Sequence, residues 1–310
     1  MIMKKLFLII LMLAVPMMAS ASDKEDFVIE NGVLLEYNGS DSYVEIPGTV
    51  KVINEIAFRG NKKLLSVKIP GSVEEIQGNA FKNCTSLRTV NGMAQTVGES
   101  AFAGCTALSE LPQLDAVEVL GDRAFSGCIS IEQAVFNENL TQLGSEVFLD
   151  CTGLKHVELP HTLTEIGSGA FMNCTSLKSV HIDVKKGEGI TEIGERAFYN
   201  CQALTETFIP ETVTKIGPYA YYRCVSLTAM QIPDTVDKIG DYAFAECIGL
   251  KKVSVSENTN TADTAFYGCV SLNKSFDKNE DLIRAYDFFL KANIFISKNV
   301  TGTPITAARI

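Results

Sequence analysis

Residues 151–171 read CTGLKHVELPHTLTEIGSGAF, and this stretch recurs along the chain with small changes. It ends in Ala170-Phe171, and an Ala-Phe pair or a close relative of it appears ten times, at spacings of 21 to 27 residues. A cysteine stands three positions after nine of these aromatic residues, whereas Asn61 takes that place after Phe58. A fixed period of this length is typical of repeat proteins, in which each unit forms one coil.

Each part of the unit has a physical interpretation. Apolar and polar residues alternate around Val157 and Leu159, which predicts a short strand with one buried face. Pro160 ends that strand, because proline donates no ladder hydrogen bond. Ile166 and Gly167 then predict a short helical or irregular return segment, with the glycine suited to a tight bend. One coil buries too little apolar surface to fold alone, so the coils are expected to stack.

The full unit, CxxLxxVxIPxxVxxIGxxAF, resembles the BspA-like leucine-rich repeat of bacterial surface and secreted proteins, over about residues 26–272. Residues 27–37, with Asn31-Gly32 as a turn, are also similar to the entry hairpin of that family. The resemblance implies an α/β repeat fold, a curved right-handed leucine-rich repeat solenoid. It places parallel strands on the concave face and short helical or irregular segments on the convex face.

The N-terminus has the pattern of an export signal. Residues 1–21 combine two lysines, an apolar run and the small residues Ala19-Ser20-Ala21 as a cleavage site. A membrane anchor is the alternative, but the run is shorter than the ~20 residues of a span and contains Pro16. No cysteine lies near the cleavage site to accept a lipid. The mature protein is therefore expected to be secreted or at the cell surface, or else periplasmic, and not integral to a membrane.

The remaining boundaries follow the repeat. We expect an N-terminal hairpin cap and half coil over 22–56, a solenoid of about ten repeats over 57–272, and a C-terminal cap over 273–310. Apolar residues between 280 and 292 have helical spacing, which predicts a helix that covers the last coil or docks a partner.

Two coils depart from the unit. Between Ile182 and Ile190 the chain is four residues longer, and residues 183–189 are predicted to form a mobile loop, interpreted as a tolerated insertion. Near Gly92 and Pro112 the Ile-Pro signature is missing, which predicts an irregular stretch of the solenoid.

Nine cysteines in an exported chain first suggest disulfides. All nine occupy one repeat position, however, so they are expected to stack as a buried column of free thiols. Disulfides between adjacent coils remain the alternative, because stacked coils approach disulfide distance.

The register of the repeats also aligns the outward side chains of the strands in rows. The candidate binding residues are His156, Glu158, His181, Glu206, Phe208 and Gln231. The two histidines and two glutamates suggest a metal or acid-base site, with a solvated polar strand face as the simpler interpretation. Phe208 is a large apolar residue among polar ones, as in contact hot spots. No role is predicted for His161.

Composition limits the function. A net charge of −10 argues against nucleic acid as a partner, and absence of tryptophan makes a glycan ligand less favoured. No nucleophile elbow, HExxH or phosphate-loop motif occurs, and no cofactor is expected. The chain is interpreted as a non-enzymatic binding or adhesion module for a protein, matrix or host-surface partner, which it recognises through the concave face. Alternatives are a scaffold or glycan-capture module of a surface assembly, and a metal-dependent activity at His156 and His181.

Overall fold

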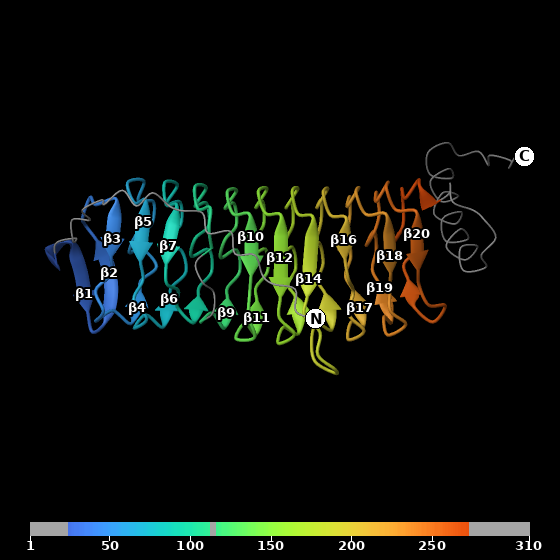
Figure 1. Ribbon diagram of the computed structural model, residues 1–310, viewed down its shortest axis with the longest axis horizontal. Helices are drawn as coiled ribbons and strands as arrows, with labels where there is room; N and C mark the ends of the chain where they lie inside the picture. The colour runs from blue at the N-terminus through green and yellow to red at the C-terminus, as the bar shows by residue number, and fades with distance from the viewer. Residues whose placement is uncertain (1–23, 112–115, 273–310) are drawn as a thin grey trace, which may run out of the picture.

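The computed structural model describes residues 24–111 and 116–272, which form one row of stacked coils (Figure 1). The predicted signal peptide at 1–21, the predicted cap at 273–310 and Pro112 lie outside the described residues. Within the two described ranges, no helix has the length and apolar character needed to cross a membrane. Most coils contribute two short strands, and like strands of successive coils pair in parallel, as β12 does with β14 and β13 with β15. The stacking that the repeat period predicts is therefore confirmed.

The row begins with an antiparallel hairpin. η1 (Lys24–Asp26) leads into β1 (Phe27–Glu30), which pairs with β2 (Val33–Tyr37). Asn31 and Gly32 have φ angles of 49° and 81°, the left-handed conformation that a two-residue hairpin turn uses. β2 also pairs in parallel with the first coil, so the hairpin covers an edge that would otherwise expose unpaired backbone groups.

The longer strands of the coils form one surface, which we call the long-strand face. In β12 (His156–Leu159) the buried Val157 stands between two exposed residues, as the sequence alternation predicts. This face contains β3 (Tyr43–Glu45), β5 (Ser66–Lys68), β7 (Thr89–Asn91), β10 (Gln133–Val135), β12, β14 (Ser179–Ile182), β16 (Glu206–Thr207), β18 (Ala229–Gln231) and β20 (Lys252–Ser254).

The ladder of the long-strand face is interrupted twice. Its strands fall into three sheets, β3-β5-β7, β10-β12-β14-β16 and β18-β20. The first interruption follows Asn91, in the stretch that lacks the Ile-Pro signature, and this agrees with the irregularity predicted there. The second follows Thr207, a polar residue at the inward position that valine holds in β12 and β14.

The second strand of each coil is two residues long. These strands are β4 (Val52–Ile53), β6 (Glu75–Ile76), β8 (Thr96–Val97), β9 (Val119–Leu120), β11 (Gln142–Leu143), β13 (Glu165–Ile166), β15 (Glu192–Ile193), β17 (Lys215–Ile216), β19 (Lys238–Ile239) and β21 (Asn260–Thr261). Sequence analysis allowed a helical or irregular segment here. Among the described residues the one helical element is η1, so the helical alternative is not confirmed, and the coils close through turns and this second parallel ladder.

A column of glycines follows the short strands, and its physical reason differs from the predicted tight bend. None of the glycines at 121, 144, 167, 194, 217 and 240 has a left-handed φ. Instead, adjacent coils approach closely at these positions. A Cβ atom on Gly167 would lie only 2.6 Å from the carbonyl oxygen of Gly144 in the preceding coil. Glycine therefore serves close stacking of the coils.

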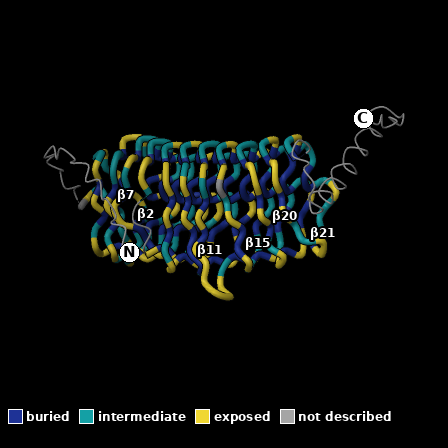
Figure 2. The backbone as a smooth tube through the Cα atoms, turned by 45° about the vertical axis from the view of Figure 1, so that its right-hand side comes forward, coloured by how far each residue is buried: buried dark blue, intermediate teal, exposed yellow. Residues whose placement is uncertain are grey.

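The core runs the length of the row, dark blue in Figure 2. Its centre is a column of nearly parallel aromatic rings; the Phe148 and Phe171 centroids, for example, are 5.6 Å apart with planes inclined by 4°. The rings belong to Phe58, Phe81, Phe102, Phe125, Phe148, Phe171, Phe198, Tyr221, Phe244 and Phe266. Offset stacking of aromatic rings at such separations adds to the free energy of unfolding beyond what burial of the rings supplies.

Beside the rings lies the predicted column of cysteines. All nine are free and buried. Each thiol donates a hydrogen bond of 3.0 to 3.2 Å to the backbone carbonyl of the aromatic residue one coil earlier. The alternative of disulfides between coils is not adopted in this structure.

Candidate functional site

The predicted binding residues of the central coils lie on one part of the long-strand face. In the ladder His156 stands opposite Ser179, and Glu158 stands opposite His181. The backbone of Glu206 pairs with that of Ser179 in the next position of the same sheet. The structure thus brings strands β12, β14 and β16 together in the register that the repeats predict.

The two histidines of this face are exposed and do not converge on a common group. His156 Nδ1 lies 2.8 Å from the hydroxyl of Ser179, across the ladder. His181 belongs to the neighbouring row, beside the exposed Glu158. Acid-base catalysis generally uses a desolvated pocket, whereas both of these rings lie exposed on the strand face.

Two apolar side chains stand out on the long-strand face. Val135, which pairs with Glu158, is 51% exposed, and Phe208, just after β16, is 54% exposed. With Glu158 and His181 between them along the row, they form what we call the central patch: Val135, Glu158, His181 and Phe208. Gln231 follows in the next coil, on β18, which pairs with β20 and belongs to a separate sheet.

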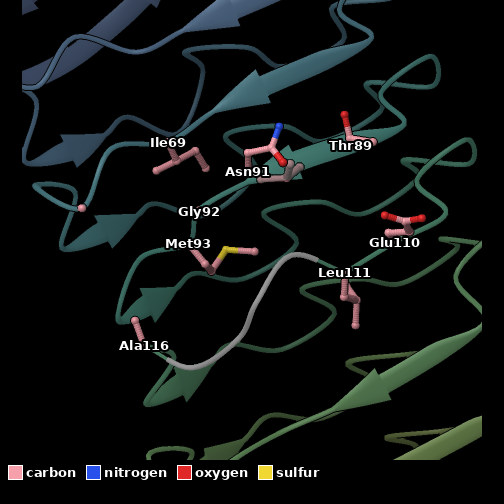
Figure 3. A pocket seen from close by; sticks show the side chains of 10 residues that line it. Ile69, Thr89, Asn91, Gly92, Met93, Glu110, Leu111 and Ala116 are labelled. Atoms are coloured by element: carbon pink, nitrogen blue, oxygen red, sulfur yellow. The ribbon is translucent and has the colours of Figure 1, made fainter. Parts of the chain in front are cut away.

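A pocket lies at the first interruption of the long-strand face (Figure 3). It has a volume of about 600 Å³, and its lining includes Ile69, Asn91, Met93, Glu110 and Leu111. The pocket adjoins residues 112–115, which lie outside the described part of the chain. A second hollow, of about 430 Å³, runs over the glycine column beside the short strands.

Tyrosines near the C-terminal end of the row pack on one another. The rings of Tyr219 and Tyr242 stack at 5.1 Å, and those of Tyr199 and Tyr222 at 4.9 Å. Arg196 lies 5.4 Å from the centre of the Tyr219 ring. Because these ring faces already have partners, they offer less surface for stacking on a sugar.

Sequence analysis missed a cluster around His161. The ring is only 6% exposed, and its Nδ1 lies 2.9 Å from Oδ2 of Asp183. The hydrogen bond with His161 lowers the pKa of the Asp183 carboxyl. A carboxylate oxygen of Glu138 also lies within 4.8 Å of ligand atoms on His161 and Asp183.

One signal for this cluster was present in the sequence. Glu138 and His161 occupy the same position of adjacent repeats, 23 residues apart. In the next repeat, Asp183 stands at the position that Pro160 holds in the repeat before it. Each residue alone looked like an exposed loop residue. Only the contacts between three coils show that the side chains converge.

Comparison with known proteins agrees with the fold. The family model described as "BspA type Leucine rich repeat region" matches residues 35–94, 89–188 and 183–294. No curated protein matches the chain.

Three bacterial leucine-rich repeat structures are similar. A Treponema pallidum protein has 22% identity and a TM-score of 0.51, covering 67% of this chain and 90% of its own. A Bacteroides ovatus protein has 24% identity and a TM-score of 0.42. A Faecalibacterium prausnitzii cell surface protein has 23% identity and a TM-score of 0.45. Each of these two matches covers 79% of this chain and 90% of the other chain. The family match spans most of the sequence, and the chain belongs to the BspA-type leucine-rich repeat family.

Proposed function

We propose that this chain is a non-enzymatic binding module that acts outside the cytoplasm and recognises a protein or extracellular-matrix partner, such as one on a host surface. Leucine-rich repeat solenoids commonly present an extended strand surface to other macromolecules. The contact is made through the long-strand face, which the family resemblance places on the concave side. The export pattern at residues 1–21 supports an extracellular or cell-surface location.

The observation that carries this proposal is the central patch. Val135 and Phe208 expose about half of their side chains, and they flank a glutamate and a histidine. Interfaces between proteins combine an apolar anchor with a polar rim, and aromatic residues are enriched among the anchors. Water is released from both apolar side chains when a partner covers them, which supplies the driving force.

The alternative is a scaffold or glycan-capture module in a surface assembly. Both alternatives use the same face, and the nature of the ligand distinguishes them. A pull-down from extracellular and matrix proteins, run beside a glycan array, separates them directly. Recovery of glycans alone would favour the alternative, whereas recovery of a protein supports the proposal.

Variants link the recovered partner to the patch. Phe208→Ala and Val135→Ala are each expected to weaken binding, because they remove an exposed apolar anchor without disturbing the core. Ile129→Ala is the matched control, since Ile129 is 47% exposed but lies in a turn after Cys128, away from the strands. Equal losses in all three variants would contradict a role for the long-strand face.

A further inference from the structure

A second candidate site lies on the edge of the coils, where the long-strand segments end. The chain after β14 makes the extra loop of residues 183–189, which projects from the row of coils (Figures 1 and 2). Within this loop, Lys185 and Glu188 form an antiparallel bridge. Lys185 Nζ also lies 3.0 Å from Glu188 Oε2.

The loop brings two carboxylates to the buried ring of His161. Asp183 faces one ring nitrogen, with Oδ2 at 2.9 Å from Nδ1, and Glu188 faces the other, with Oε2 at 3.6 Å from Nε2. Glu138, from the coil before His161, adds a third carboxylate next to Asp183. Three successive coils thus place three carboxylates around one imidazole.

A neutral imidazole of His161 cannot donate a hydrogen bond to both of the carboxylates that face it. A neutral histidine carries a single N–H, so it donates to one of the two carboxylates and presents a lone pair to the other. At 6% exposure the ring has little water to relieve that repulsion. A cation between the ring and the carboxylates relieves it, because a nitrogen lone pair and carboxylate oxygens are then all ligands.

From this geometry we propose that His161, Asp183 and Glu138 bind one divalent transition-metal ion, with zinc as the best fit. In the bound form Nδ1 of His161 faces the metal and its Nε2–H donates to Glu188, an outer carboxylate of the kind that commonly orients a metal-bound histidine. A set of one imidazole nitrogen and carboxylate oxygens suits zinc, whereas calcium and magnesium prefer oxygen ligands throughout.

The bound metal joins the loop to two earlier coils. Glu138 and His161 belong to adjacent coils, and Asp183 begins the loop in the third. Coordination therefore restrains residues 183–189 against the edge of the solenoid. Lys185 and Lys186 are exposed in that loop, so their cleavage by trypsin reports how firmly the loop is held.

Calorimetric titration of the purified chain with zinc tests the proposal, with calcium and magnesium as comparison ions. We expect about one zinc per chain, and binding weakened about tenfold or more in Glu138→Gln and Asp183→Asn. Both carboxylates are exposed, so these variants are expected to fold, as circular dichroism would show. His161→Ala should abolish binding, and His156→Ala is the matched control that keeps it.

Two further readouts separate this site from the thiols and from the other histidines. Cobalt bound at the proposed ligands gives visible absorption without a thiolate charge-transfer band, and zinc slows tryptic cleavage at Lys185 and Lys186. The proposal is overturned if zinc does not bind, if a thiolate band appears, or if loss of binding follows His156→Ala instead of His161→Ala.

Discussion

The thiol of Cys174 donates a hydrogen bond of 3.1 Å to the backbone carbonyl of Phe148, one coil earlier. The same bond links each of the nine cysteines to the aromatic residue of the preceding coil. The carbonyl of Phe148 also accepts the backbone N–H of Cys151 at 3.1 Å, so the thiol supplies its second donor, one that alanine lacks. The repeated cysteine therefore acts as a weak hydrogen-bond donor inside the core, in its reduced state.

The first prediction concerns the oxidation state of the cysteines. In the folded protein, a thiol reagent such as Ellman's reagent should react slowly, because all nine thiols are buried. In denaturant the count should rise to nine free thiols. A count near one in denaturant would show that the column is paired as disulfides and would contradict the structure.

The second prediction concerns alkaline pH. Burial raises the pKa of Cys128 to about 12, and it also raises the pKa of Cys151, Cys174 and Cys224. These thiols stay protonated in the folded chain, whereas in the unfolded chain they ionise above about pH 8.5. Their contribution to the free energy of unfolding is thus complete below pH 8.5 and is lost as the pH rises toward the folded pKa values.

Each such thiol lowers the free energy of unfolding by about 1.4 kcal/mol per pH unit above that point. Denaturant unfolding under reducing conditions between pH 7 and pH 10 measures the effect. We expect a steep loss of stability above pH 9, and a flat profile would show that the thiols are not protected from ionisation.

The third prediction concerns the close approach of coils at the glycine column. Gly167→Ala places a Cβ atom 2.6 Å from the carbonyl oxygen of Gly144, and backbone must shift to admit it. We expect a loss of about 2 kcal/mol in the free energy of unfolding, within the range of overpacked cores. Gly71→Ala is the control, because a Cβ atom there meets nothing within 4 Å. Equal stabilities of the two variants would refute the close-approach explanation.

The fourth prediction concerns Thr207, a polar residue at the end of β16 whose side chain faces the core. Thr207 Oγ1 is buried and makes no hydrogen bond of good geometry. Burial raises the pKa of the Tyr221 phenol, and the nearby Thr207 hydroxyl partly offsets that rise. Thr207→Val should therefore stabilise the protein by about 1 kcal/mol, since it removes an unsatisfied buried hydroxyl.

Tyr221→Phe, alone and combined with Thr207→Val, completes a double-mutant cycle measured by denaturant unfolding. If Thr207→Val destabilises the chain and the double variant recovers the loss, the two hydroxyls are bonded to each other. That result would contradict an unsatisfied Thr207.

Much of the fold could be predicted because the repeat period constrains it. Once Val157 and Val180 are placed inward, the period fixes the cross-strand neighbours of His156 and Glu158, and the structure has the same register. The second parallel ladder was harder to predict, since a two-residue strand such as Glu165–Ile166 has no alternation long enough to detect. The interruption after Thr207 likewise depends on how neighbouring coils pack.

The cluster at His161 shows a different limit. Counting residues aligns a coil with its neighbours, but it does not give the path that an inserted loop takes. Asp183 reaches His161 because the amide of Asp183 bonds to the carbonyl of Leu159 at 2.8 Å, which returns the chain to the preceding coil. That bond continues the ladder of β12 and β14 by one residue, at the position where proline, which has no amide N–H, stands in coils such as that of Pro160. Aligning the repeats does not by itself show that the Asp183 side chain reaches His161.

The central claim is that the long-strand face contacts the partner, and site-specific photo-crosslinking tests it most directly. A benzophenone amino acid replaces Phe208, which is 54% exposed, or Ile248, which is 47% exposed but lies in a turn. Each protein is then irradiated with extracellular and matrix proteins. The account predicts a crosslinked partner from position 208 and none from position 248. A partner captured from position 248 and not from position 208 would contradict it.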